Sequence, residues 1–334
     1  MLMKELHHKS VMIEEVLSIL KPSDGKIYID GTLGAGGHSK RILESARCKV
    51  IGIDKDPEAI KLCNDIKERY KKEFFPIEGN FSELKNCALS LGHEYVDGIL
   101  LDLGVSSMQL DSPDRGFSFK YNAPLDMRMN KSGDKAYNLI NSAKENLLAD
   151  IIFKYGEERL SRKIAKEIVK QREIKRIKTT FDLSEIVTRV SKWHKRKIHP
   201  ATKTFQAIRI YLNNELKELY DALLSSEEIL SEGGKLIVIS FHSLEDRIVK
   251  NFIRDNSIPK KKYNSLNIEK SFVYESRRVL RPTKEEINEN KRSRSAKLRW
   301  VYRSSLPFNS IENLHDYQKY GGIICWGILF LYFC

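Results

Sequence analysis

The sequence predicts an α/β fold whose parallel sheet is doubly wound and interrupted by a block of helices. Apolar runs of strand length alternate with helical segments between Ser10 and Gly104. This alternation is typical of parallel strands joined by crossover helices. A glycine-rich stretch, YIDGTLGAGGHSKRIL (Tyr28–Leu43), joins the first strand to a helix. The alternation stops over residues 111–198, which read as a loop followed by helices, and strands resume after them.

The first half of the pattern contains three buried strands and the helices between them. Ser10 precedes apolar residues at three- and four-residue spacing, which predicts a helix to Leu20. Pro57 follows Asp56 and predicts the first turn of another helix, with Asp56 as its N-cap. The remaining expected elements are strands at Lys26–Asp30, Cys48–Asp54 and Val96–Gly104 and a helix at His38–Ala46.

Strand signals return after the helical block. The expected elements are a strand at Gly233–Phe241, a helix at Ser243–Arg254, and strand-like runs near Phe272–Val279 and Lys297–Tyr302. We therefore expect one discontinuous domain at 1–110 and 199–303, an inserted helical domain at 111–198, and a C-terminal extension at 304–334.

The charge distribution favours a polyanionic partner. The formal net charge is +13 over 334 residues, and residues 159–197 contribute +10 of it, with 14 Lys/Arg against four acids. The first expected partner is nucleic acid, and the second is an anionic membrane surface. The alternative is that the lysines are simply solvated and bind no partner. The five cysteines show no disulfide framework or metal-ligand spacing. We therefore expect no resident metal and a cytoplasmic location.

The glycine stretch indicates a ligand that approaches the backbone closely. Gly34 and Gly36 partly fit the dinucleotide fingerprint, but Ser39 stands where its third glycine would be. Asp54 ends the second strand, where an acid accepts hydrogen bonds from ribose hydroxyls. A ribose-bearing cofactor is therefore expected, either a nicotinamide dinucleotide or S-adenosylmethionine (SAM); tight packing of helix on strand is the structural alternative.

Two acids at strand ends favour SAM. Asp102 lies at the carboxyl end of the third strand and Asp30 at that of the first. Ligands of such sheets bind in the crevice outside these ends. Two carboxylates there would repel a pyrophosphate and suit a cationic methionyl group.

Nine segments together resemble the bacterial small-subunit ribosomal RNA N4-cytosine methyltransferase family. The resemblance covers residues 6–302 and is carried by SVMIEEVL, YIDGTLGAGGHS, GIDKDPEAI, DGILLDLGVSSMQLDSPDRGFSF, PLDMRM, YGEERLSRKIAKEIV, HPATKTFQAIRIYLNNEL, VISFHSLEDRIVKNFIR and RSRSAKLR. It implies a Rossmann-like class I SAM-dependent methyltransferase fold with an inserted helical domain. It also implies methylation of the exocyclic N4 of a cytidine in the decoding centre of 16S rRNA, a contribution to ribosomal decoding.

The resemblance also implies the cofactor contacts. These are Gly36, Gly37, His38, Asp54, Phe81, Asp102 and Gln109. Asp102 is the candidate catalytic acceptor for N4. Many N4-amino methyltransferases carry an Asn/Asp/Ser-Pro-Pro-aromatic tetrad after this strand, where this chain has Asp102-Leu103-Gly104-Val105. The aromatic platform for the base is therefore absent from its usual position. His199, Arg209, His242, Glu245 and Asp246 are further candidates, with a structural role as the alternative for each histidine.

The inserted block is expected to grasp RNA. Arg162 and Lys166 are predicted on a helix face opposite Ile164 and Ile168, and Lys195, Arg196 and Lys197 follow Trp193. Cations mixed with aromatic side chains suit phosphate contact and base stacking. The partner would be 16S rRNA, in the small ribosomal subunit. The competing functions are a nucleotide-dependent oxidoreductase, which lacks a complete glycine fingerprint here, and a non-catalytic RNA-binding protein that keeps SAM binding as a relic.

The last 14 residues, GGIICWGILFLYFC, are almost entirely apolar. A membrane span needs about 20 such residues, so no membrane association is expected. The alternatives are a weak anchor, an additional strand, or an extension without a selected role, and we favour the last.

Overall fold

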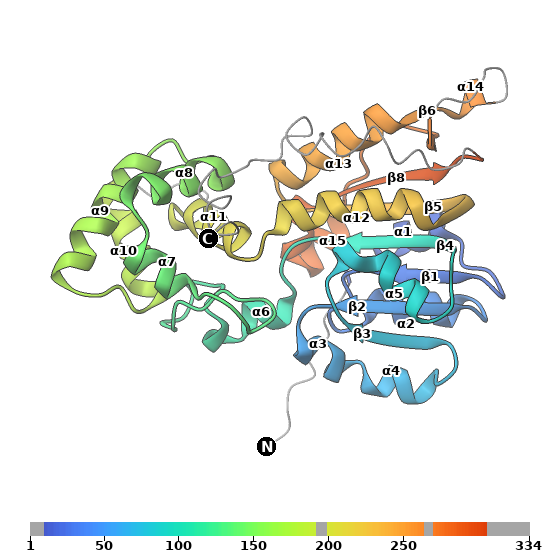
Figure 1. Cartoon of the computed structure of the whole chain (residues 1–334), viewed down its shortest axis with the longest axis horizontal. Helices are drawn as coiled ribbons and strands as arrows, with labels where there is room; N and C mark the ends of the chain where they lie inside the picture. Colours follow the sequence, from blue (N-terminus) through green and yellow to red (C-terminus); the bar gives the residue numbers. More distant parts are fainter. Residues whose placement is uncertain (1–9, 192–198, 264–269, 306–334) are drawn as a thin grey trace, which may run out of the picture. The chain divides into compact units, whose positions relative to one another are not determined.

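The computed structural model describes residues 10–191, 199–263 and 270–305, which form two compact units (Figure 1). Unit 1 contains residues 10–104 and 216–305 of the described chain, and unit 2 contains residues 105–215. The predicted C-terminal extension and the cations Lys195, Arg196 and Lys197 lie outside the described residues.

Unit 1 is built on one eight-stranded sheet, with the order β3-β2-β1-β4-β5-β8-β7-β6. Strands β3, β2, β1, β4 and β5 are parallel, and β8 is antiparallel to both β5 and β7. The bounds are β1 Ile27–Asp30, β2 Lys49–Asp54, β3 Phe74–Glu78, β4 Val96–Asp102, β5 Leu230–Ser240, β6 Ser257–Pro259, β7 Phe272–Tyr274 and β8 Lys297–Arg303. The strand order reverses between β1 and β4, as in a doubly wound Rossmann-like sheet, which confirms the predicted fold class.

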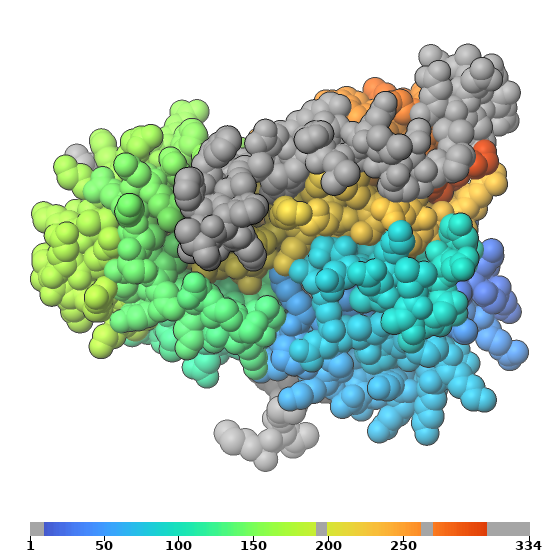
Figure 2. Space-filling model, in the orientation of Figure 1, coloured from blue at the N-terminus to red at the C-terminus, as the bar shows by residue number. Residues whose placement is uncertain are grey.

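Helices cover this sheet. They are α1 Ile13–Leu20, α2 Gly37–Ser45, α3 Pro57–Leu62, α4 Asn64–Arg69, α5 Leu84–Ser90, α12 Glu215–Ile229, α13 Ser243–Asn256, α14 Lys260–Tyr263 and α15 Lys284–Glu289. Figure 2 shows atoms of α5 (teal) and α12 (yellow) at the surface of unit 1 that faces the viewer. Ile99, Leu100 and Leu101 on β4 have no exposed surface, because both faces of this central strand are covered.

Two expectations for unit 1 need correction. The first helix begins at Ile13 instead of directly after the expected cap, Ser10, because Met12 has a left-handed backbone and its N–H donates to the Glu286 carboxylate at 2.8 Å. The strand expected near Phe272–Val279 is the short β7, which ends at Tyr274. Pairing with the end of β8 and with β6 stops there, so the following residues leave the sheet.

Unit 2 is helical. It contains α6 Ser107–Asp111, α7 Ala136–Ser142, α8 Glu145–Gly156, α9 Ser161–Ile174, α10 Thr180–Ser191 and α11 Ala201–Leu212. Its core contains Ile152 of α8, Ile164 of α9 and Ile208 of α11. The α8 and α11 backbones approach closely because Gly156 lacks a Cβ, which would lie 2.6 Å from the Lys203 carbonyl oxygen.

The boundaries of the units differ from the expected domain limits. The structure divides the chain at 104/105 and 215/216 rather than at 110/111 and 198/199. Phe205 and Ile208 of α11 are buried in the helical core, and Val105 and Leu110 pack against it. These contacts place the segments on either side of the expected insertion in unit 2. No helix in the described ranges combines the length and apolar character of a bilayer span.

Candidate active site

The glycine loop between β1 and α2 is shaped by close packing. Gly36 has a φ of 75° and precedes α2, so it adopts a left-handed conformation that side chains other than glycine resist. A Cβ on Gly37 would lie 2.0 Å from the Ser10 Oγ atom. Both glycines are therefore required by the protein's own packing. They set the start of α2, whose first N–H groups have no partners within the helix.

Asp54 joins the end of β2 to this loop. Its carboxylate accepts hydrogen bonds from the Gly34 N–H at 2.8 Å and the Asp56 N–H at 2.9 Å. Burial raises the pKa of Asp54 to about 6, although both N–H groups act to lower it. Each carboxylate oxygen has two lone pairs, so both oxygens can accept a further hydrogen bond from a ligand hydroxyl. Asp56 caps α3 by accepting from the Glu58 N–H at 3.1 Å, as expected.

Three ionisable side chains lie together at the point where the strand order reverses. Asp30 ends β1, Asp102 ends the neighbouring β4, and His38 lies in the first turn of α2. The His38 Nε2 atom is 3.5 Å from the Asp102 Oδ2 atom. Burial raises the pKa of Asp30. Burial acts to lower the pKa of His38, but the adjacent Asp102 and Asp30 carboxylates raise it above its usual value.

The Asp102 carboxylate is positioned by the strand and left with an unsatisfied atom. The Asp102 backbone N–H donates to the Thr32 Oγ1 atom at 2.6 Å. The Asp30 carboxylate on the neighbouring strand accepts from the Ser39 hydroxyl at 2.7 Å. The buried Asp102 Oδ1 atom has no hydrogen-bond partner among the described residues. A buried carboxylate oxygen without a partner is costly, so this atom is suited to a ligand that donates hydrogen bonds or carries positive charge.

Phe81 lies beside the same loop. It begins a short 3₁₀ turn, Phe81–Glu83, that follows β3 and is capped by Asn80, whose side chain accepts from the Ser82 N–H at 3.0 Å. A Cβ on Gly31 would lie 3.3 Å from the Phe81 Cβ atom. The half-buried Phe81 ring is thus placed next to the glycine loop, where a planar group could pack on it.

Comparison with known proteins decides the family. Residues 5–304 match the model of the MraW methylase family. The chain belongs to the MraW methylase family. Proteins named ribosomal RNA small subunit methyltransferase H are 50% identical over 299 residues in Rickettsia bellii (strain RML369-C), covering 87% of this chain and 97% of that protein. The same name and identity apply in Wolbachia sp. subsp. Drosophila simulans (strain wRi), with 89% and 99% covered. A solved rRNA methylase from Streptococcus thermophilus aligns at a TM-score of 0.38 and 9% identity, covering 89% of this chain and 99% of that one.

Gln109, a further predicted cofactor contact of this MraW-family chain, has a structural task within unit 2. Its side-chain oxygen accepts from the Ser106 N–H, and its own N–H donates to the Ser106 hydroxyl, both at 3.2 Å. This is the capping box of α6. The Ser-x-x-Gln spacing from Ser106 to Gln109 is itself the sequence signal for this cap. Contact of Gln109 with the cofactor stays a prediction.

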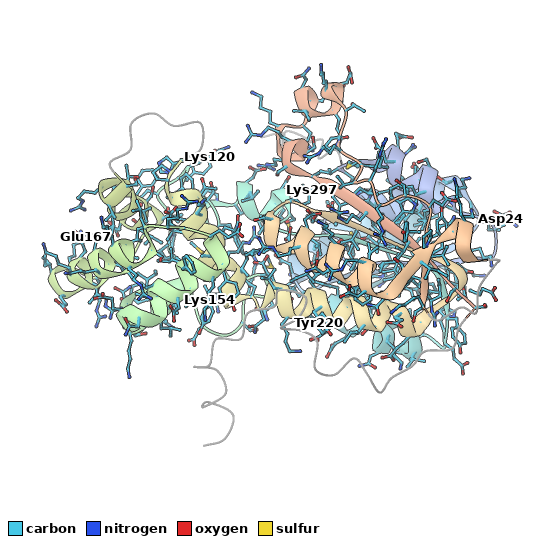
Figure 3. All side chains as sticks on the ribbon, turned by 90° about the horizontal axis from the view of Figure 1, so that it is seen from above. Asp24, Lys120, Lys154, Glu167, Tyr220 and Lys297 are labelled. Atoms are coloured by element: carbon cyan, nitrogen blue, oxygen red, sulfur yellow. The ribbon has the colours of Figure 1, made fainter. Side chains whose placement is uncertain are left out.

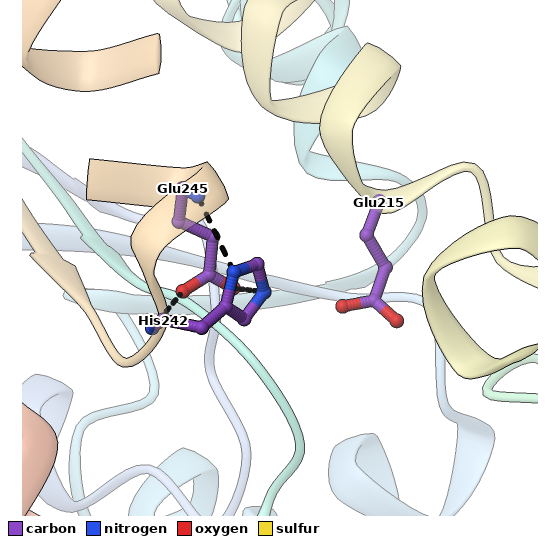
Figure 4. A group of neighbouring side chains, drawn as sticks. All are labelled: Glu215, His242 and Glu245. Carbon is purple, nitrogen blue, oxygen red and sulfur yellow. Dashed lines mark hydrogen bonds and ion pairs between the residues drawn. The ribbon is translucent and has the colours of Figure 1, made fainter. Parts of the chain in front are cut away.

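Two further candidates also form a cap. His242 and Glu245 begin α13 in unit 1, where the Glu245 N–H donates to the His242 Nδ1 atom and the Glu245 carboxylate accepts from the His242 N–H (Figure 4). Asp246 binds Lys297 and Arg299 at 2.8 Å each. In unit 2, Glu215 of Figure 4 pairs with Arg209 at 2.8 Å. These contacts give each of the candidates a structural role.

The predicted RNA-binding cations of α9 are accessible. Arg162 and Lys166 are exposed, whereas Ile164 and Ile168 on the same helix are buried in the core of unit 2. The structure thus separates an apolar inner face of α9 from a cationic outer face.

His199 stacks on Phe119 with ring centroids 4.6 Å apart, and burial lowers the pKa of His199.

Proposed function

We propose that this protein is a SAM-dependent methyltransferase acting on the exocyclic N4 of a cytidine in the decoding centre of 16S rRNA. Ribosomal RNA as the substrate class is supported by membership of the MraW methylase family and by 50% sequence identity to proteins named ribosomal RNA small subunit methyltransferase H. The single structural observation that carries the chemistry is the unpartnered Asp102 Oδ1 atom at the switch point of the sheet. Asp30 lies on the adjacent strand, so the site attracts cationic groups.

The residues present fit SAM as the donor. SAM, when bound, supplies a methyl group carried on a positively charged sulfonium. The first N–H groups of α2 suit the methionine carboxylate, and Asp54 retains acceptor capacity for ribose hydroxyls. Asp102 suits the methionine ammonium, and Phe81 offers a face for adenine. A dinucleotide fits less well, because Asp30 and Asp102 would repel its pyrophosphate.

The protein must also assist a weak nucleophile. The N4 lone pair of cytosine is delocalised into the ring, and positive charge develops on N4 as the methyl group arrives. Carboxylates fixed near that atom stabilise this charge without reorganising. Asp102 is the residue we assign to accept the N4 hydrogen bond. The His38 Nε2 atom lies 3.5 Å from its carboxylate and would form an ion pair with it when protonated.

Unit 2 is assigned to RNA recognition. The outer face of α9 presents Arg162 and Lys166, which can neutralise phosphates. We propose that the RNA is recognised in the small subunit or a late precursor, in the cytoplasm, because the decoding centre is a folded site.

Labelled methyl transfer from SAM tests this function. The protein should label small subunits that lack the modification, and Asp102→Ala should reduce the rate by at least about 100-fold, the usual effect of removing one electrostatic stabiliser. Asp114→Ala is the matched control, an exposed acid of a 3₁₀ turn in unit 2. Binding of NAD, or absence of label in any rRNA, would contradict the proposal.

A further inference from the structure

The segment between β7 and β8 carries an unassigned concentration of positive charge. Residues 277–294, here called the basic strap, contain seven Lys/Arg against three acids. We propose that the basic strap binds the phosphate backbone of the RNA beside the target nucleotide. Unit 1 would then contact the substrate RNA directly. The inference rests on the proposed function, because it takes RNA as the partner.

The strap lies at the ligand edge of the sheet. Because β8 is antiparallel to β5, its first residue, Lys297 (labelled in Figure 3), pairs with Ser240 at the carboxyl end of β5. Ile239 of β5 pairs with Leu298 on one side and with Asp102 of β4 on the other. With about 4.8 Å between neighbouring strands, the start of β8 is roughly 10 Å from Asp102.

Two contacts fix the strap at that edge. Leu280 forms a backbone bridge with Leu298. Glu286 of α15 accepts from the Met12 N–H at 2.8 Å. In Figure 1, α15 is drawn beside the arrowhead of β4, the carboxyl end of that strand. Ser293 and Ala296 are buried, which anchors the turn between α15 and β8. The strap therefore has a defined position relative to Asp102.

The strap cations face solvent, unlike the cations of β8. Arg278, Arg281 and Arg294 are exposed and make no ion pair within the described part of the chain. Lys297 and Arg299, by contrast, both bind Asp246. The strap arginines are thus available to a ligand, and guanidinium groups suit bidentate phosphate contact.

Charge complementarity favours RNA over other partners. Glu286, one of the three strap acids, is engaged by the Met12 N–H. The exposed surface is therefore mainly cationic and lies beside the site where the target base must be presented. An acidic protein surface would match the same charge, and its binding is an outcome that the test separates.

A salt titration of binding tests the strap. The variant Arg278→Gln/Arg281→Gln/Arg294→Gln is measured against small subunits lacking the modification and against a naked 16S fragment containing the decoding centre. The slope of log K against log salt should fall by about 0.7–0.9 for each lost phosphate contact. SAM affinity, measured by calorimetry, should be unchanged. The corresponding triple Lys variant, which keeps the charge, should recover most of the slope.

A matched control uses cations at the opposite edge. Lys67 lies on α4, and the exposed Lys71 and Lys72 precede β3, where the strands begin. Replacing these three by Gln removes the same charge and should leave the slope unchanged. Equal salt slopes for wild type and the Arg→Gln variant would overturn the strap proposal. The proposal would also be overturned if the variant lost binding to subunits but not to the naked RNA fragment, because that result indicates a protein partner. If the wild-type protein methylated no RNA, the proposed function would be overturned instead. The salt slope measured on the naked fragment would still show whether the strap binds RNA phosphates.

Discussion

Replacing Asp54 by Asn should weaken SAM binding while leaving the fold intact. The carboxylate accepts from the Gly34 and Asp56 N–H groups and keeps one lone pair on each oxygen for the ribose. An amide removes the charge and turns one acceptor into a donor. A hydrogen bond to a charged group contributes about 1.5–3 kcal/mol, so Kd should rise roughly 10- to 150-fold.

The pH dependence of SAM binding tests the same residue. Because burial raises the pKa of Asp54 to about 6, about a tenth of it is ionised at pH 5. Wild-type Kd should therefore be roughly tenfold higher at pH 5 than at pH 7, and the Asp54→Asn variant should lack this contribution. Without ligand, the free energy of unfolding has the opposite pH dependence. Because the pKa of Asp54 in the folded protein is higher than its ordinary value of 3.8, this residue stabilises the fold most fully below pH 3.8. That stabilisation is lost as the pH rises through about 6.

Isothermal calorimetry across this pH range is the assay. Asp56→Asn is the matched control, since it changes the neighbouring acid but Asn also caps helices well, and its SAM affinity should equal that of wild type. Thermal unfolding confirms that both variants are folded. An Asp54→Asn variant with wild-type affinity at pH 7 would refute the assignment of the ribose contact.

Three other changes have defined outcomes. Asp102→Asn should weaken SAM binding and also lower the rate at saturating SAM; full recovery of the rate at saturation would limit Asp102 to holding the cofactor. Gly37→Ala should cost about 1–3 kcal/mol of unfolding free energy in a denaturant titration, because its Cβ would collide with the Ser10 Oγ atom, and Ser10→Ala should restore part of it. Failure of Ser10→Ala to do so would contradict this cause. Arg162→Gln with Lys166→Gln should lower the salt dependence of RNA binding without changing SAM affinity, and an unchanged slope would remove this face of α9 from the interface.

The ends of the parallel strands could be predicted because each combines two strong signals. Buried apolar runs stop at Asp30, Asp54 and Asp102, and the structure ends β1, β2 and β4 at these residues. The third strand was expected to continue to Gly104, so only its acidic residue and not its last residue was located correctly. An acid cannot continue a strand buried on both faces without a partner. The parallel arrangement then collects such ends at one edge of the sheet, which is why a site could be placed there from the sequence.

Contacts between residues distant in the chain could not be predicted. The approach of the His38 Nε2 atom to the Asp102 carboxylate, at 3.5 Å, brings α2 and β4 together and has no signal in the sequence. The start of α1 depends on Glu286, which is 274 residues away. The helix α11 follows the expected insertion, yet its apolar face packs into the helical core. Each of these outcomes is set by tertiary packing, which overrides local preference.

Nucleoside analysis of the modified RNA tests the central claim most directly. Small subunits lacking the modification are incubated with the protein and methyl-labelled SAM, and the decoding-centre fragment of 16S rRNA is isolated and digested to nucleosides for mass spectrometry. The label should appear as N4-methylcytidine at one position, and its rate of appearance should fall by at least about 100-fold with Asp102→Ala. Label on another atom, such as C5 or a ribose hydroxyl, or in another part of the RNA, would contradict methylation of this N4 atom.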